Sequence, residues 1–221
     1  GWNREFVSTS DPLGQGMGSS AVSVTRAFWM MVRSGDVTVK QYVCPSSGDD
    51  EDETEDLENY YDFMGYHNIS YGFQVPFGPR DTQAREGMDN RQIVMADKSP
   101  YYINVQPDWD SVGQNPPINL DDSPKTWRPF NSSNHGGAGN GEGQNCLYAD
   151  GHASFQRIPA VGIDNDNIFT LMTDSWGDPN AANRIHGFTV HDSPEQYPYP
   201  GQNVFGTGAN MFSSTDTLIY P

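Results

Sequence analysis

The stretch GQNCLYADGHASFQ (residues 143–156) decides the fold. In it, Asp150-Gly151 stands between two short runs of β-forming residues, near 144–148 and 153–157. Asp-Gly in this setting is the strongest short-range signal for a β-hairpin, because a type I′ turn needs a positive φ at both of its central positions. The stretch therefore predicts an antiparallel hairpin with a type I′ turn.

Further elements are expected upstream of this hairpin. Apolar residues at helical spacing, Val24, Ala27, Phe28 and Met31, predict a helix that Ser19 or Ser20 caps and Gly35 ends. β-prone runs predict additional strands. These runs lie near residues 37–43, 66–75 and 92–97. The expected fold class is α+β, with the N-terminal helix packed on an antiparallel β-sheet and long loops carrying the remaining residues.

The domain organisation follows from shifts in composition. Residues 1–18 are expected to be an extended segment, 19–170 a globular domain, and 171–221 a loop-rich C-terminal extension. Inside the domain, eight of the ten residues in 49–58 are acidic, and charges this dense predict a solvated surface loop or a loop that binds cations or a partner. The stretch 98–134 is either ordered by its aromatic residues or is an insertion used for contacts.

Charge and hydropathy limit the partners. The net charge of −17 and the pI of about 4.3 argue against nucleic acid and anionic lipid surfaces as partners. The longest unbroken apolar run, residues 27–32, is far too short to span a bilayer. Contact with a membrane is therefore expected only through an N-terminal helix that this sequence does not contain.

The two cysteines, Cys44 and Cys146, lie far apart and form no Cys-x-x-Cys motif. They fit either one disulfide in an oxidising compartment or two buried thiols. Of these, we expect a Cys44–Cys146 disulfide. It would close a loop of about 100 residues and would stabilise the fold by about 4 kcal/mol in the chain-entropy model.

Two groups of residues are candidate metal ligands. Asp97, His135, Asp150 and His152 offer mixed histidine and carboxylate ligands, which suit zinc, manganese or iron, whereas carboxylates alone suit calcium. The simpler interpretation is that Asp150 makes the turn, His152 starts a strand and His135 donates a hydrogen bond that holds a loop.

A second, weaker candidate is a calcium loop that begins with Asp164 and Asp166. It lacks the glycine and the glutamate of an EF-hand, since Phe169 and Ser175 occupy those positions. A turn or a helix cap explains the same residues.

Aromatic residues in loop-like sequence are candidate binding residues, since exposed rings stack on sugars or fill pockets of a partner. The alternative is that they cover the core. They are Trp109, Trp127, Trp176, Tyr197 and Tyr199.

Signatures of catalysis are weak. The chain has no Gly-x-Ser-x-Gly elbow and no His-Glu-x-x-His motif. Glu142 and Asp150 could be drawn as a glycosidase pair, but any acidic protein offers such pairs by chance. No catalytic residue is assigned, and the chain is expected not to be an enzyme.

Several segments, which follow one another along the chain in a fixed order, resemble those of a known family. They are the helix that ends at Gly35 and residues 42–46, 68–77, 95–100, 131–135 and 143–152. Over residues 19–170 the chain resembles the bacterial proteins that combine a prepilin-type cleavage/methylation N-terminus with a C-terminal His…Asp-Gly processing-associated domain. Those proteins are similar to the pseudopilins of type II secretion. Here fourteen residues separate His135 from Asp150, more than is usual in the family.

The resemblance implies a pilin-like head that works outside the cytoplasm. It implies a structural subunit or accessory pseudopilin of a type IV pilus-like or type II secretion-like assembly, with self-association and other pilin-like or secretion subunits as contacts. It also favours calcium, which major pseudopilins hold in a C-terminal loop. The alternative is a cell-surface binding module for polysaccharide or another surface protein, and a third, less favoured hypothesis is metal-dependent hydrolysis.

Overall fold

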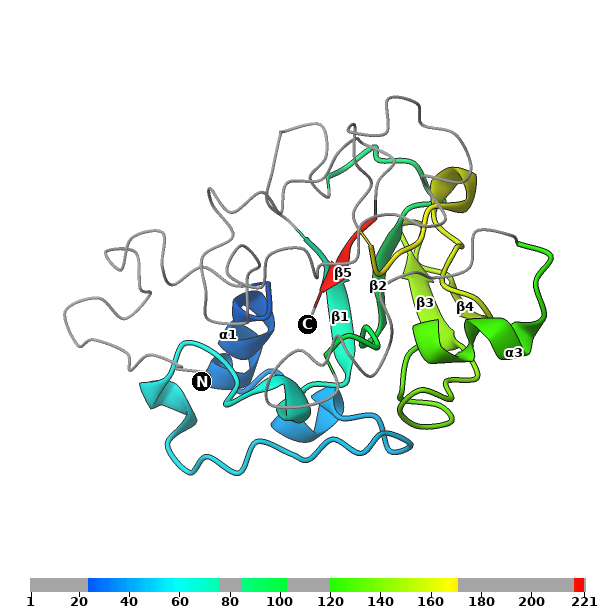
Figure 1. The fold of residues 1–221 in the computed structure, drawn as a ribbon. Helices are drawn as coiled ribbons and strands as arrows, with labels where there is room; N and C mark the ends of the chain where they lie inside the picture. The colour runs from blue at the N-terminus through cyan, green and yellow to red at the C-terminus, as the bar shows by residue number, and fades with distance from the viewer. Residues whose placement is uncertain (1–23, 76–84, 103–119, 171–216, 221) are drawn as a thin grey trace.

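A five-stranded antiparallel sheet is the centre of the computed structural model, which describes residues 24–75, 85–102, 120–170 and 217–220 (Figure 1). The strand order is β4-β3-β2-β1-β5. The strands are β1 (Tyr71–Gln74), β2 (Ile93–Asp97), β3 (Gln144–Tyr148), β4 (Ala153–Gln156) and β5 (Ile219–Tyr220). Helices and short helical turns surround the sheet, so the expected α+β class is confirmed.

The hairpin predicted from residues 143–156 is present, with β3 and β4 paired from Gln144↔Gln156 to Leu147↔Ala153. Its turn is not type I′. Gly151 has a φ of 88°, while Asp150 is not among the described non-glycine residues with positive φ. The Gly151 N–H donates to the Tyr148 carbonyl at 2.9 Å. A turn with one left-handed glycine therefore replaces the expected pair of left-handed residues.

Helix α1 (Arg26–Ser34) packs on the sheet as expected. Its end is a left-handed Gly35 with a φ of 79°, and the N–H groups of Gly35 and Asp36 donate to the carbonyls of Val32 and Met31. The helix begins after Thr25, and Ser19 and Ser20 lie outside the described residues. The Phe28 ring meets the Phe73 ring of β1 edge to face, with centroids 5.3 Å apart.

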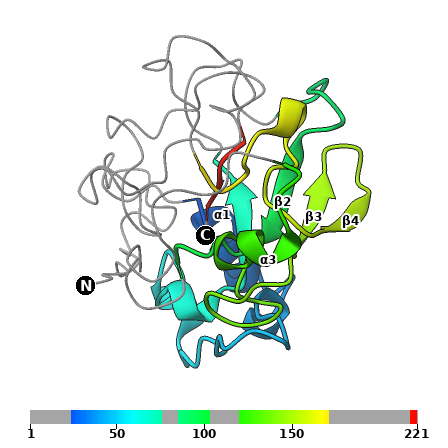
Figure 2. The same ribbon diagram turned by 45° about the vertical axis from the view of Figure 1, so that its right-hand side comes forward.

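A separate apolar core lies against each face of the sheet. The α1 face is built around Trp29, Phe63 and Ile69, and Phe73 and Met95 of the sheet pack against it. The opposite core takes residues from β2, β3, β5 and the segments after them. Its members include Ile93, Ala96, Tyr101, Tyr102, Cys146, Tyr148, Ile168, Phe169, Leu218 and Ile219. Apolar side chains thus pack on both faces of the β1–β2 region. Figure 2 shows these strands in a turned view, with α1 beside them.

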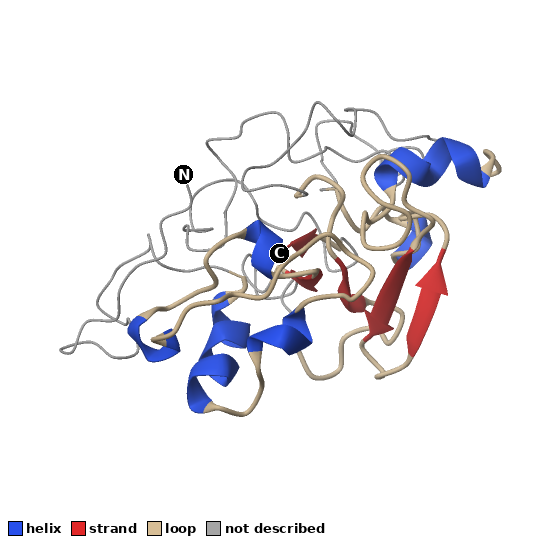
Figure 3. Cartoon of the chain, turned by 90° about the horizontal axis from the view of Figure 1, so that it is seen from below, coloured by secondary structure: helices blue, strands red, loops and turns tan. Residues whose placement is uncertain are grey.

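Two expected strands are partly or wholly helical turns. Residues 37–43 contain the 3₁₀ turn η2 (Val39–Tyr42), because the Gln41 side chain accepts from the Thr38 N–H at 2.8 Å and completes a capping box. In 66–75, the 3₁₀ turn η4 (Tyr66–Asn68) precedes β1. The other short helices are η3 (Leu57–Asn59), α3 (Pro124–Trp127), η5 (Arg128–Phe130) and η6 (Ile163–Asn165), and Figure 3 shows how the helical pieces surround the strands.

Two segments expected to be loops contribute to the core. In the described parts of 98–134, Tyr101, Tyr102 and Trp127 are buried, so aromatic packing orders these parts. In 171–221, residues Ile219 and Tyr220 pair with β1, and Leu218 and Ile219 are buried. The C-terminal extension therefore supplies a strand, which its composition did not indicate.

Gly143 is expected to resist substitution, because it combines a φ of 150° with a close approach to β4. A Cβ at this position would collide with the Gln156 carbonyl oxygen and the Phe155 ring. Gly143→Ala should lower the free energy of unfolding by about 1–3 kcal/mol, measured by urea denaturation. Gly48→Ala is the control, since a Cβ there meets nothing within 4 Å. Equal losses in both variants would contradict the steric argument.

Candidate functional site

A buried carboxylate at the end of β2, Asp97, holds the ends of the neighbouring segments together. Its side chain is 1% exposed. Asp97 Oδ2 accepts from the backbone N–H of Asn145 at 2.6 Å and from its side-chain amide at 3.2 Å, and Oδ1 accepts from Asn134 Nδ2 at 3.1 Å. His135 Nε2 lies 3.3 Å from Oδ2. One carboxylate thus binds both the 131–135 loop and the start of β3.

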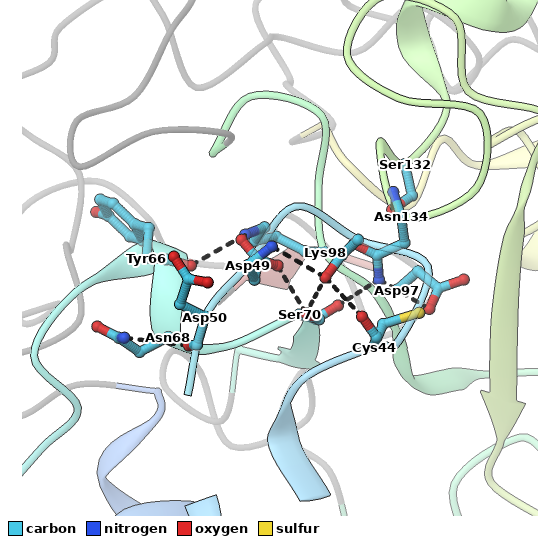
Figure 4. Close-up of polar contacts among 11 residues, drawn as sticks. Cys44, Asp49, Asp50, Tyr66, Asn68, Ser70, Asp97, Lys98, Ser132 and Asn134 are labelled. Atoms are coloured by element: carbon cyan, nitrogen blue, oxygen red, sulfur yellow. Dashed lines mark hydrogen bonds and ion pairs between the residues drawn. The ribbon is translucent and has the colours of Figure 1, made fainter. Parts of the chain in front are cut away.

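The next residue, Lys98, forms a second buried cluster (Figure 4). Its ammonium, on a side chain that is 1% exposed, contacts Asp49 Oδ1 and donates to the Tyr66 carbonyl at 3.0 Å. The other carboxylate oxygen of Asp49 accepts from Ser70 Oγ at 2.6 Å. Burial lowers the pKa of the Lys98 ammonium, and the Asp49 charge opposes that shift.

The backbone carbonyl of Ser70 joins the two clusters. The Ser70 carbonyl accepts from the Lys98 N–H at 2.8 Å and from Asn134 Nδ2 at 2.6 Å. Ser70 Oγ also lies 2.9 Å from Ser47 Oγ. We call Ser47, Asp49, Ser70, Asp97, Lys98, Asn134 and Asn145 the polar network. It links the segment after η2 with β1, β2, β3 and the 131–135 loop, and its charged groups are mutually satisfied inside the fold.

The acidic stretch 49–58 is only partly the solvated loop that its charge predicted. Asp49, with a side chain 7% exposed, and Asp52, at 3%, are buried. Asp49 neutralises Lys98, and Asp52 Oδ2 accepts from the Met64 N–H at 2.7 Å. The Asp50 N–H donates to the His67 carbonyl at 2.8 Å. The first residues of the stretch are therefore fixed to the body, and the carboxylates after Asp52 are exposed.

The four residues of the first expected metal site form two pairs. His135 lies beside Asp97, and His152 Nδ1 lies 2.5 Å from Asp150 Oδ1. His152 also stacks on the Tyr148 ring, with centroids 4.1 Å apart. In the part of the chain that the structure describes, no three histidine, cysteine or acidic side chains gather as a metal site would require. The loop-holding role considered for His135 and the turn role of Asp150 fit this geometry.

Asp164 and Asp166 do not gather into such a group either. Asp164 is exposed and left-handed, with a φ of 57°. Asp166 is buried, and its Oδ2 accepts from the Thr217 N–H at 2.6 Å, immediately before β5. Asp166 therefore fixes the C-terminal strand, a role that was expected neither from a calcium loop nor from a turn or helix cap.

Among the aromatic residues expected to bind partners, Trp127 is fully buried in α3 against Ala160. The expectation of an exposed ring is wrong for Trp127, because this ring forms a small core under α3. The others, Trp109, Trp176, Tyr197 and Tyr199, lie outside the described residues.

A surface hollow that the sequence did not indicate lies between α3 and β4. It has a volume of about 190 Å³ and is lined by Pro124, Arg128, Glu142, Phe155 and Arg157. We call it the basic hollow. The Phe155 ring at its wall is 46% exposed. Alternation along β4 could have indicated an outward Phe155, but only the fold brings Arg128 and Arg157 together around it.

No family model, curated protein or solved structure matches this chain. The resemblance to pseudopilin-like proteins therefore rests on its motifs. In addition, none of the helices in the described ranges has the length and hydropathy needed to cross a bilayer.

The expected disulfide is absent, because Cys44 and Cys146 are both free, buried thiols. They serve opposite faces of the sheet. Cys146 belongs to the core with Ala96, whereas Cys44 hydrogen-bonds Tyr71, which alternates to the α1 face together with Phe73. Burial, and to a lesser degree the Asp97 charge, raises the pKa of the Cys146 thiol to about 12.

Thiol labelling should therefore be slow in the folded protein, because a buried, protonated thiol is a poor nucleophile. After unfolding in denaturant without reductant, two thiols per chain should react. Reaction of none after unfolding would show that the cysteines are bonded and would contradict this arrangement.

Proposed function

We propose that the chain is a structural subunit or accessory pseudopilin of an extracytoplasmic, pilus-like or secretion-like assembly. The observation that supports this role is the polar network, whose charged groups are used to hold five segments together inside the fold. A network of this kind, in which the charged groups are buried and paired, gives a rigid head rather than a reactive surface. The order of the family motifs along residues 19–170 is a second, independent support.

The arrangement of α1 on the sheet is compatible with a pilin-like head. In this proposal an apolar helix would anchor the subunit, as the family resemblance implies, and the sheet would carry the contacts with neighbours. The partners would be copies of the same chain and other pilin-like or secretion subunits. Calcium or zinc would act, if bound, as a structural staple.

A cell-surface binding module is the second candidate, and the basic hollow favours it. An exposed aromatic ring beside two arginines is suited to acidic sugars or to acidic groups of a surface protein. In this version the same head would work as a monomer.

Electron microscopy of the native material, with an element scan of the same sample, tests the proposal. Filaments or ordered assemblies that bind an antibody against this chain are the expected result. Monodisperse monomers would overturn the structural role, and retention of those monomers on an array of acidic polysaccharides would establish the second candidate.

A further inference from the structure

The basic hollow gathers cations that lack an acidic partner. Lys40, Arg91 and Lys98 each pair with an acidic residue. Within the described residues, by contrast, Arg128 and Arg157 of the lining form no ion pair, and neither does Lys125 of the neighbouring α3. In a chain with a net charge of −17, the lining of this hollow carries two cations and one carboxylate.

The chemistry of the hollow suits carboxylate side chains. Its volume of about 190 Å³ is below the roughly 300–1,000 Å³ of pockets that enclose drug-sized ligands. Arginine forks bind carboxylates in a bidentate manner, and Phe155 offers apolar contact for the methylenes of glutamate. Arg128 Nη1 is oriented by Asn140 Oδ1 at 2.9 Å. Glu142 is the one carboxylate in the lining and opposes an anionic occupant.

The chain itself carries such carboxylates at the other end of the sheet. We define the acidic segment as residues 50–58, whose exposed acids are Asp50, Glu51, Glu53, Glu55, Asp56 and Glu58. Figures 1 and 3 place this segment on the α1 side, whereas α3 and β4 lie at the opposite end of the molecule. One copy therefore cannot bring its own acidic segment to its own hollow.

We propose that the acidic segment of one copy binds the basic hollow of a second copy, head to tail. This inference deepens the proposed structural function and rests on it. Because the two patches differ, each contact leaves one patch free at either end, so copies add into an open chain rather than a closed dimer. Repulsion between the negative copies is screened beyond about 8 Å at 0.15 M salt, while the contact acts at hydrogen-bond distance.

Sedimentation of the full chain over a concentration series at 0.15 M salt tests the contact. The wild type should form species that grow beyond dimers. Arg128→Glu/Arg157→Glu and Glu53→Lys/Glu55→Lys should each lower the association constant at least about tenfold. Mixed together, these two variants should associate again, because an intact hollow meets an intact acidic segment and the two reversed patches also carry opposite charges. That recovery also shows that both variants are folded.

Two single variants sharpen the test. Arg91→Glu changes the net charge as much as Arg157→Glu but lies outside the hollow, so it should leave association near the wild-type value. Glu142→Gln should strengthen association. A monomeric wild type at all concentrations, or charge-reversal variants that associate like the wild type, would overturn the inference.

The failure of this contact and the failure of the structural role can be told apart. If native filaments are seen while the charge-reversal variants associate like the wild type, the contact is wrong and the structural role stands. If the two variants associate only when they are mixed but native material contains no assemblies, the contact stands and the structural role is wrong.

Discussion

Replacing Asp97 with alanine is expected to lower the free energy of unfolding by about 3–5 kcal/mol, because it removes three hydrogen bonds to a buried charge. Their donors are the Asn145 N–H and the side-chain amides of Asn134 and Asn145, and the Asn134 amide keeps the Ser70 carbonyl as an acceptor. A loss of this size is a large fraction of the total stability of a typical domain. Urea denaturation followed by tryptophan fluorescence measures it.

Two variants separate hydrogen bonding from a general effect of charge. Asp97→Asn keeps the shape but turns one oxygen into a donor that faces other donors, so it should also destabilise strongly. Asp150→Ala removes an exposed carboxylate and should cost less than about 1 kcal/mol. A loss for Asp97→Ala no larger than the loss for Asp150→Ala would contradict the role of Asp97 as the centre of the polar network.

Breaking the Lys98–Asp49 pair is expected to be equally severe. Asp49→Leu leaves a buried ammonium without its counter-charge and should cost about 3–5 kcal/mol, whereas Lys98→Met/Asp49→Leu removes both charges and should recover most of that loss. A double-mutant cycle measured by urea denaturation gives the coupling, which should exceed about 2 kcal/mol.

The chain provides a matched control for this cycle. Lys40 and Glu51 form an ion pair of 3.6 Å, but their side chains are 78% and 47% exposed. In a cycle of the same kind, Lys40→Met, Glu51→Leu and the double variant should each change stability by less than about 1 kcal/mol, because solvent screens the exposed pair. Equal coupling energies for the two pairs would show that burial does not strengthen the Lys98–Asp49 interaction.

The elements that depend on neighbouring residues could be predicted from the sequence. Asp150-Gly151 identified the β3–β4 hairpin, and Gly35 identified the end of α1, because glycine supplies the left-handed conformation at both places. The run 92–97 was predicted correctly as β2. The turn type was not predicted correctly, because Gly151 alone takes the positive φ.

Contacts between distant segments could not be predicted in this way. The charge density of residues 49–58 suggested that the whole stretch is solvated. Charge density gives no information on Lys98, which lies almost fifty positions away and pairs with the buried Asp49 side chain. The polar network and the basic hollow both depend on which strands become neighbours, and β5 depends on residues 217–220. Asp97 was identified as a candidate site residue, but its partners make it a structural anchor.

The pairing of β5 with β1 also determines at what point during synthesis the sheet can complete its folding. Residues 219 and 220 follow β1 by well over half of the chain, so a polypeptide that emerges from a ribosome or a translocon exposes β1 long before its partner strand exists. Until then one edge of the sheet is open to pairing with other chains. Folding of this protein is therefore expected to finish only after synthesis or export has passed residue 220, and a chaperone that shields the β1 edge would act in that interval.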